Sequence, residues 1–269
     1  MPKSNTSKPV GIIKWFARFF GVNGVDLKRM AYAAMSFPQF FRDMSAYCRK
    51  TVRGGRFPFR VSQIYPCLAD YRETSGSASG HYFHQDLYVA RKIFERQPSR
   101  HVDIGSRIDG FIAHLLCFMP VDCVDIRPLT SSVAGLNFVQ SDATQLANFA
   151  TESLDSISSL HAAEHFGLGR YGDPVDPDAC FHFMSSLKRV LAPGGRLYFS
   201  VPVGLERLEF NAQRVFAPET VMAAFQGLSL VSFSAVLDDK NMYEGIGMEL
   251  AAAAEFGCGI FEFTKSITY

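Results

Sequence analysis

Short apolar runs alternate with polar and amphipathic stretches over most of the chain. Five of these runs lie near residues 101–104, 121–125, 137–140, 154–160 and 196–201. Between the last two, apolar residues recur every three or four positions over 181–191, which is typical of a helix with one buried face. Alternation of strands with helices predicts a mostly parallel sheet. Two later segments, 228–237 and 260–264, predict strands six and seven, paired antiparallel.

Residues 101–111 contain the turn that says most about a possible ligand. A β-prone run passes through Asp103, Gly105 and Ser106 follow it, and Gly110 opens a second apolar pattern. A strand–turn–helix junction of this kind lets a ligand approach backbone N–H groups at the positive end of a helix. Asp125 ends the next strand at the spacing of a nucleotide-binding βαβ unit, where a carboxylate can accept both ribose hydroxyls.

The same turn indicates which nucleotide is expected. Arg107 stands where a dinucleotide-binding turn carries its middle glycine, so the pattern favours an adenosine without a pyrophosphate. Asp103 would suit a cationic ammonium group. Arg107 could pair with a carboxylate of the ligand, or form a salt bridge with Asp109 or Asp125. S-adenosylmethionine combines an adenosine with an ammonium and a carboxylate.

Further along, Asp142 with Ala143 follows the third predicted strand, Glu164 with His165 follows the fourth, and a Pro-Gly-Gly turn precedes the fifth. With these motifs the chain resembles class I S-adenosylmethionine-dependent methyltransferases over about residues 98–237. Through residues 81–87 and 101–107 it is similar to an uncharacterised bacterial methyltransferase-like family. The resemblance implies an α/β fold: a Rossmann-like seven-stranded mostly parallel sheet with an antiparallel last strand, helices on both faces and a helical N-terminal extension.

The resemblance also implies S-adenosylmethionine as cofactor. Asp142 would accept a hydrogen bond from the adenine amino group, or cap a helix over residues 143–150. The predicted cofactor-binding residues are Asp103, Gly105, Ser106, Arg107, Asp125, Ile126, Asp142 and Ala143.

The catalytic candidates are His161, Glu164 and His165, at the carboxyl end of the fourth predicted strand, where ligands meet open α/β sheets. Methyl transfer to oxygen or nitrogen requires alignment of the acceptor and removal of its proton. A histidine suits that proton near pH 7, and Glu164 could orient it or bind substrate. The alternative is that Glu164 and His165 only stabilise the loop.

The substrate candidates come from two other segments. His81, Tyr82 and His84 open a helix behind a loop of small residues at 73–80, which could act as a lid. Asn211 and Arg214 follow the fifth strand and could contact a polar acceptor. His81 and His84 lie three apart, but no third histidine joins them in the pattern, so no metal site is expected.

Composition narrows the function classes. Hydrophobic residues make up 48% of the 269 positions, enough for a domain over residues 98–269 with an extension and lid over 1–97. A net charge of +1 supplies no concentrated basic face for nucleic acid. The six cysteines form no Cys-x-x-Cys pair, which predicts free thiols rather than zinc or disulfides. No apolar run reaches the roughly 18 residues of a membrane span, so a cytoplasmic location is expected.

The N-terminal segment carries an amphipathic pattern over residues 11–20. Trp15, Phe16 and Phe19 share one predicted helical face, with Lys14 and Arg18 opposite. Such a helix could pack on the domain, form a dimer contact, or make a peripheral contact with an anionic membrane.

The leading expectation is a methyltransferase acting on a small-molecule polar or glycan-type acceptor. A catalytically inactive methyltransferase-like scaffold that binds a partner through the N-terminal helix is the alternative of a different class. A third hypothesis, an NAD-dependent oxidoreductase, is disfavoured by Arg107.

Overall fold

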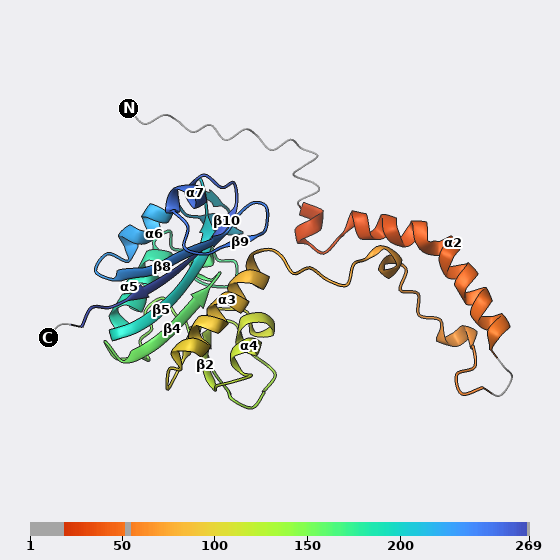
Figure 1. Ribbon diagram of the computed structural model, residues 1–269, viewed down its shortest axis with the longest axis horizontal. Coiled ribbons are helices and arrows are strands. Elements are labelled where there is room, and N and C mark those ends of the chain that lie inside the picture. Colours follow the sequence, from red (N-terminus) through yellow and green to blue (C-terminus); the bar gives the residue numbers. More distant parts are fainter. Residues whose placement is uncertain (1–18, 52–54, 268–269) are drawn as a thin grey trace. The chain divides into compact units, whose positions relative to one another are not determined.

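The computed structural model describes residues 19–51 and 55–267, and it divides into an N-terminal unit, residues 1–77, and a sheet unit, residues 78–269 (Figure 1). The division lies before helix α3 (His81–Arg96), whereas the sequence places it after that helix. The reason is packing, because Val89, Ala90 and Ile93 of α3 are buried in the core of the sheet unit.

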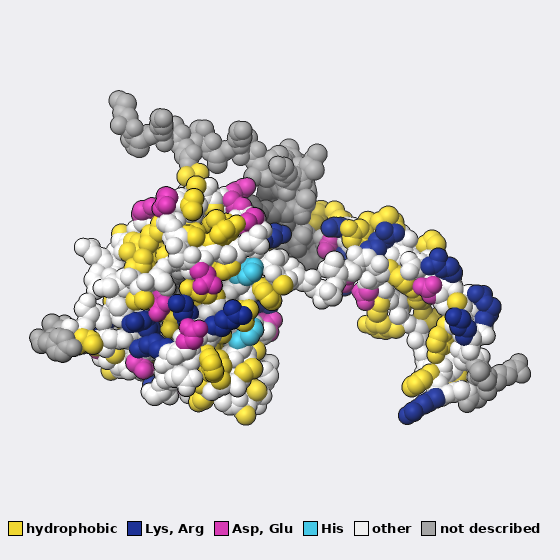
Figure 2. All heavy atoms as spheres, viewed as in Figure 1, with side chains coloured by type: hydrophobic (Ala, Val, Ile, Leu, Met, Phe, Trp, Pro, Cys, Tyr) yellow, Lys and Arg dark blue, Asp and Glu magenta, His cyan; other side chains and the backbone are white. Residues whose placement is uncertain are grey.

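The N-terminal unit is built on helix α2 (Leu27–Lys50), with short 3₁₀ turns η1 (Val61–Gln63) and η2 (Ala69–Arg72). The first turn of α2 is capped by Asp26, which accepts from the Arg29 backbone N–H at 2.9 Å. Figure 2 shows apolar and basic side chains intermingled over this helix. Of the amphipathic pattern at 11–20, only Phe19 and Phe20 lie within the described residues. In the described parts of the chain, no helix is both long and apolar enough to cross a membrane.

An eight-stranded sheet, in the order β3-β2-β1-β4-β5-β10-β8-β9, forms the centre of the sheet unit (Figure 1). The first five strands are parallel, β10 is antiparallel to both of its neighbours, and β9 is antiparallel to β8. The predicted mostly parallel α/β fold is therefore confirmed, with eight strands rather than seven because β9 adds an edge. The strands are β1 (Val102–Ile104), β2 (Val121–Asp125), β3 (Leu136–Gln140), β4 (Leu154–Leu160), β5 (Leu191–Val203), β8 (Ser229–Val236), β9 (Met242–Tyr243) and β10 (Gly257–Thr264).

Each face of the sheet has its own core. Along β5, Leu197 and Phe199 enter the core of one face while Tyr198 between them enters the other, as the strand period of two requires. The first face is covered by α5 (Ala179–Val190), α6 (Pro218–Ala224) and α7 (Met248–Ala252), and the second by α3, the π-helical turn η3 (Ile108–Ile112) and α4 (Ala113–Leu115). A short 3₁₀ turn, η4 (Ala163–His165), and a hairpin, β6 (Arg207–Glu209) with β7 (Gln213–Val215), complete the unit.

Two local expectations differ from the structure. Residues 143–150 form turns and no helix, since Asp142 closes a tight turn onto the Thr144 backbone N–H at 2.8 Å. The Pro-Gly-Gly turn lies inside β5 rather than before it, where the register against β4 shifts between Leu154 and Ser156. The extra residues are absorbed as a bulge in the strand.

A buried chain of polar side chains joins β1 to β4. His101, with no exposed surface, contacts Ser156 Oγ through Nδ1 at 2.8 Å and Ser158 Oγ through Nε2 at 2.9 Å. The Ser158 hydroxyl donates to Asp103 Oδ2 at 2.5 Å, and the Ser106 hydroxyl donates to the same oxygen at 2.6 Å. Burial raises the pKa of Asp103 to about 6, although these hydrogen bonds oppose the rise.

A core substitution on α5 tests the packing of the first face. Phe183 is fully buried and its ring stacks on Phe166, with centroids 4.3 Å apart. Phe183→Ala is expected to lower the free energy of unfolding by about 3–5 kcal/mol, measured by urea denaturation followed by circular dichroism. Phe181→Ala removes the same side chain from a position 40% exposed on the same helix, and it should cost about 0.5 kcal/mol. Equal losses in the two variants would contradict the packing described.

His101 should make stability depend on pH. Burial lowers its pKa from 6.5 to about 3, so the folded chain keeps it neutral where the unfolded chain protonates it. Its effect is absent above about pH 6.5, and stability is lost as pH falls from there towards 3. Between about pH 7 and pH 5, the free energy of unfolding should therefore fall by about 2 kcal/mol less in His101→Gln than in wild type, as measured by urea denaturation. The same pH dependence in both proteins would refute this assignment.

Candidate functional site

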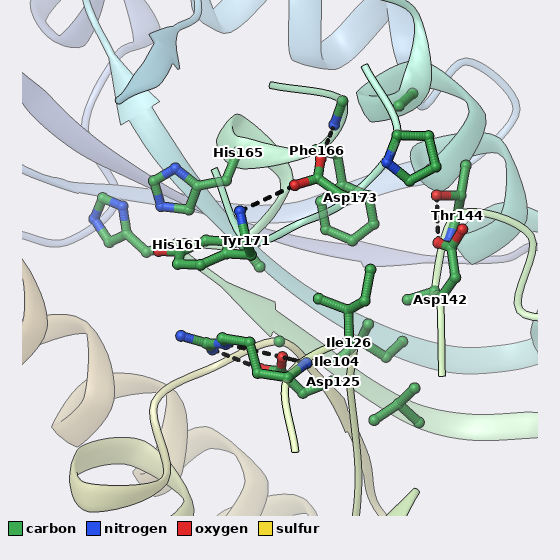
Figure 3. Close-up of a pocket in the computed structure, with 18 of the residues that line it drawn as sticks. Ile104, Asp125, Ile126, Asp142, Thr144, His161, His165, Phe166, Tyr171 and Asp173 are labelled. Atoms are coloured by element: carbon green, nitrogen blue, oxygen red, sulfur yellow. Dashed lines mark hydrogen bonds and ion pairs between the residues drawn. The ribbon is translucent and has the colours of Figure 1, made fainter. Parts of the chain in front are cut away.

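A cavity of about 320 Å³ lies at the carboxyl ends of the parallel strands (Figure 3). It sits beside the point where strand order reverses, since the chain runs outward through β1, β2 and β3 on one side and through β4 and β5 on the other. Open α/β sheets bind their ligands at such a reversal. Figure 3 shows Asp142 and Thr144 at one end, Asp125 and Ile126 in the middle, and His161 with His165 at the other end.

The glycine turn after β1 forms the floor of the cavity. Gly105 has φ +76°, a left-handed conformation that glycine adopts without strain, and its N–H donates to the Val124 carbonyl at 2.9 Å. A β-carbon there would lie 2.9 Å from Ala162 Cβ. Asp103 and Ser106, predicted to bind cofactor, are instead buried beneath this turn and do not line the cavity. They hold the turn in place, because the Ser106 backbone N–H and hydroxyl both donate to Asp103.

Arg107 lines the cavity with its side chain held in place. Its Nε and Nη2 donate to the two carboxylate oxygens of Asp109, at 3.1 and 2.8 Å, and its guanidinium lies 5.0 Å from the centre of the Tyr82 ring. Arg107, which stands where a dinucleotide-binding turn carries a glycine, therefore pairs with Asp109. Asp109 does not line the cavity, so its bulk leaves the floor open.

Asp125 and Ile126, which were predicted to bind the cofactor, line the cavity at the end of β2. The Asp125 carboxylate accepts from the Arg127 backbone N–H at 2.8 Å and from the guanidinium at 2.9 and 2.6 Å. Arg127 also lies 4.7 Å from the centre of the Tyr171 ring. A cation thus already faces the carboxylate that was predicted to bind ribose.

Asp142 and Ala143 form the far end of the cavity after β3. Asp142 Oδ1 accepts from both the backbone N–H and the hydroxyl of Thr144, at 2.8 and 2.6 Å, which leaves Oδ2 available to a ligand. Ala143 is buried and supplies an apolar surface beside it.

His161 and Glu164 form a buried pair behind β4. His161 Nδ1 lies 2.7 Å from Glu164 Oε1, and His161 has φ +50°, an uncommon conformation for a residue with a side chain. Within the described residues, His161 Nε2 and Glu164 Oε2 are buried without a hydrogen-bond partner. Burial favours the neutral imidazole, but the neighbouring Cys258 and Glu164 raise the pKa of His161 well above its ordinary value. Burial likewise opposes ionisation of Glu164, and His161 outweighs it, so the pKa of Glu164 is lowered.

His165 lines the cavity next to this pair and has a different environment. Its Nδ1 lies 2.7 Å from the Ala212 carbonyl, which requires a proton on Nδ1, and its Nε2 is 3.7 Å from Glu164 Oε1. Burial lowers the pKa of His165, so the ring is neutral near pH 7. A neutral imidazole with Nε2 unprotonated can accept a proton.

The predicted substrate residues separate into two groups. Tyr82 lines the cavity, and His81 stacks on His161 with ring centroids 5.3 Å apart and planes 7° apart. His84 and Asn211 do not line it. Arg214 also lies outside, where its guanidinium donates to the Phe166 and Pro177 carbonyls at 2.7 and 3.1 Å and so holds the loop after β4.

Sequence reasoning missed several lining residues. They come from the segments that follow β2 and β4 and comprise Arg127, Phe166, Gly167, Tyr171, Asp173 and Asp176. The only sequence signal was the glycine at 167, whose structural reason is that a β-carbon there would overlap the Asp176 carbonyl. Only a glycine lets this loop fold back over the cavity, where Asp173 Oδ2 accepts from the Gly167 N–H at 2.8 Å.

Comparison with known proteins supports the fold and leaves the reaction open. A family model, DUF268, described as a Caenorhabditis protein of unknown function, matches residues 125–246. No curated protein matches the chain by sequence. The predicted closeness to a bacterial family is not confirmed by these matches and stays a prediction.

Solved structures are similar over about 70% of this chain. The [4+2]-cyclase SpnF is 12% identical with a TM-score of 0.51, over 72% of this chain and 86% of that one. The N-methyltransferase NodS from Bradyrhizobium japonicum, in complex with S-adenosyl-L-homocysteine, is 16% identical with a TM-score of 0.46, over 69% and 88%. The 1,6-didemethyltoxoflavin-N1-methyltransferase from Burkholderia thailandensis is 14% identical with a TM-score of 0.46, over 68% and 79%. At 12% identity the likeness to SpnF shows the fold alone.

The close approach at Gly105 can be tested by adding a methyl group. Gly105→Ala should lower the free energy of unfolding by about 1–2 kcal/mol because of the left-handed backbone. The contact of the new methyl group with Ala162 Cβ at 2.9 Å should lower it further. Gly227→Ala is the matched control, because Gly227 has φ +97° and open space around it. Urea denaturation should show the larger loss at Gly105, and adding Ala162→Gly should recover part of the excess. Equal losses at both glycines would contradict the close approach.

Proposed function

We propose that the chain is an S-adenosylmethionine-dependent methyltransferase that acts on a small polar or glycan-type acceptor. The observation that carries the proposal is the order of groups along the cavity, with Asp142 at one end, Asp125 in the middle and His165 at the other. That order matches an elongated ligand made of an adenine, a ribose and a reactive sulfonium.

The residues present fit this cofactor. A cavity of about 320 Å³ lies within the roughly 300–1,000 Å³ of small-molecule sites. Asp142 Oδ2 can accept the adenine amino group, and Ile126 and Ala143 supply apolar surface beside it. Asp125 can accept the ribose hydroxyls in exchange for the Arg127 guanidinium, which then keeps Tyr171 as a partner. When bound, S-adenosylmethionine supplies an electrophilic methyl group on a positively charged sulfur.

Asp103 supports the cofactor site from below, since it is buried and does not reach the cavity. The methionine end then relies on Arg107, whose guanidinium lines the cavity and can pair with a carboxylate, and on the exposed backbone of Gly105. Arg107 would have to share its guanidinium between Asp109 and that carboxylate.

His165 is the best-placed base for the acceptor. The Ala212 carbonyl holds the proton on Nδ1, so Nε2 can take the proton of an acceptor hydroxyl or amine inside the cavity. Tyr82, Arg127 and Asp173 add hydrogen-bonding groups to the same walls, which favours a polar acceptor.

One observation favours the second candidate, an inactive protein with the same fold. The Arg127 guanidinium makes two charge-assisted hydrogen bonds to Asp125 and already satisfies the carboxylate that ribose needs. A chain that never exchanges this pair would fold normally and bind no adenosyl ligand.

Calorimetry with S-adenosylmethionine, S-adenosylhomocysteine and NAD separates these candidates. We expect both adenosyl ligands to bind the wild-type protein. Asp125→Asn should weaken their affinity roughly 10- to 150-fold, because hydrogen bonds to a charged group contribute about 1.5–3 kcal/mol. Asp122→Asn is the control on the same strand, where Asp122 pairs with Arg100 and Asn137 outside the cavity. Folded wild-type protein that binds neither adenosyl ligand would refute the methyltransferase and support the inactive candidate.

A further inference from the structure

Three side chains that can bind metal converge beside the cavity. His81 is the first residue of α3, His161 follows β4, and Cys258 lies in β10. One nitrogen from each histidine and the cysteine sulfur all lie within 4.8 Å of one another. The fold brings these residues together. Strands β4 and β10 are the two neighbours of β5 in the sheet, and α3, which begins at His81, covers the same face as Cys258.

A hydrogen bond holds one nitrogen of each histidine. His161 Nδ1 is held by Glu164 Oε1 at 2.7 Å, while Nε2 is buried without a hydrogen-bond partner among the described residues. His81 hydrogen-bonds to the backbone of Phe256, and its ring lies between those of His161 and Phe256, at 5.3 and 5.2 Å. Metal-binding histidines are oriented in the same way, with the second nitrogen donating to a carboxylate or a backbone carbonyl.

Cys258 lies beside both histidines in the interior of the sheet unit. The thiol donates to Gln85 Oε1, with a sulfur–oxygen distance of 3.5 Å, and Cys258 has no exposed surface. The sulfur and one nitrogen of each histidine therefore share one small space. Unsatisfied acceptors in such a space are costly unless a cation or a proton joins them.

We propose that His81, His161 and Cys258 bind a divalent transition-metal ion, with zinc as the best match. Imidazole nitrogen and thiolate sulfur are the donors that zinc prefers, and Glu164 and the Phe256 carbonyl orient the two imidazoles. The ligand atoms would close to about 3.5 Å from one another, given metal–ligand distances of about 2.0–2.3 Å. The thiolate and the Glu164 carboxylate together balance the charge of the ion.

Three protein ligands leave the fourth position of a tetrahedral ion for water or for a donor atom of a substrate. His161 also lines the cavity, so the ion would lie at the end that holds His165. The simpler alternative is a thiolate–imidazolium pair of Cys258 with His161. That pair gives no role to His81, which is why we favour the metal. The metal proposal does not rest on the methyltransferase assignment.

The test starts from full-length wild-type protein treated with a chelator and then titrated with Zn²⁺ and with Co²⁺. Calorimetry should show one Zn²⁺ ion per chain, and the Co²⁺ protein should show a thiolate-to-cobalt charge-transfer band. Cys258→Ser should abolish the band, and His81→Gln should weaken Zn²⁺ binding at least tenfold. His84→Gln and Cys180→Ser are the controls, because both residues are buried or partly buried and lie outside the cluster. Circular dichroism confirms that each variant is folded.

Wild-type protein that takes up no metal would overturn the proposal, whatever the variants do. Cobalt bound without the thiolate band, or with a band that survives in Cys258→Ser, would also overturn it. Thiolate absorbance at neutral pH in the metal-free protein, lost in Cys258→Ser and without any metal uptake, would identify the thiolate–imidazolium pair instead.

Discussion

The buried carboxylate of Asp103 is the interaction on which the rest of the sheet unit depends. It accepts from the Ser106 backbone N–H and from the hydroxyls of Ser106 and Ser158, and so connects the turn after β1 to β4. The Ser106 hydroxyl in turn accepts from the Leu160 N–H at 3.0 Å. These bonds keep the two strands together at the reversal of strand order, where a ligand cavity requires their ends to be fixed. Burying a carboxylate is costly, and the raised pKa of Asp103 records that cost.

Two residues with left-handed backbones lie at this reversal. Gly105 turns the chain after β1, and His161 turns it after β4. For His161 the conformation carries a cost of about 1–3 kcal/mol, and the surrounding bonds sustain it. Its N–H donates to the Ser200 carbonyl at 3.0 Å, and its ring is held by Glu164. The His161 ring lines the cavity and also belongs to the cluster with His81 and Cys258, so one side chain serves both places.

Ion pairs within the cavity wall decide which charged groups are free to bind a ligand. Arg107 pairs with Asp109, and Arg127 with Asp125, each over two residues of sequence. Each guanidinium also lies over an aromatic ring, Tyr82 or Tyr171, which gives it a partner when a ligand displaces the carboxylate. A cavity built in this way can hold its charges in a defined geometry before any ligand arrives.

The sequence alone was sufficient to predict the parallel strands of the sheet and several of the residues that line the cavity. Periodicity and turn residues are local, so β4 was expected over 154–160 and is Leu154–Leu160 in the structure. The strand-end position of Asp125 followed from the same local pattern, since carboxyl ends of parallel strands share an edge. The edge strand β9 was missed because two residues carry too little pattern.

Tertiary structure alone decided which partner each polar group takes. Asp103 is buried beneath the cavity rather than lining it, Arg214 holds a loop outside the cavity, and Asp142 closes a tight turn rather than capping a helix. His81, His161 and Cys258 are far apart in the chain, and they meet only because β10 inserts between β5 and β8. Local patterns specify elements, whereas the distance between two side chains depends on the sheet order and on the direction each strand takes.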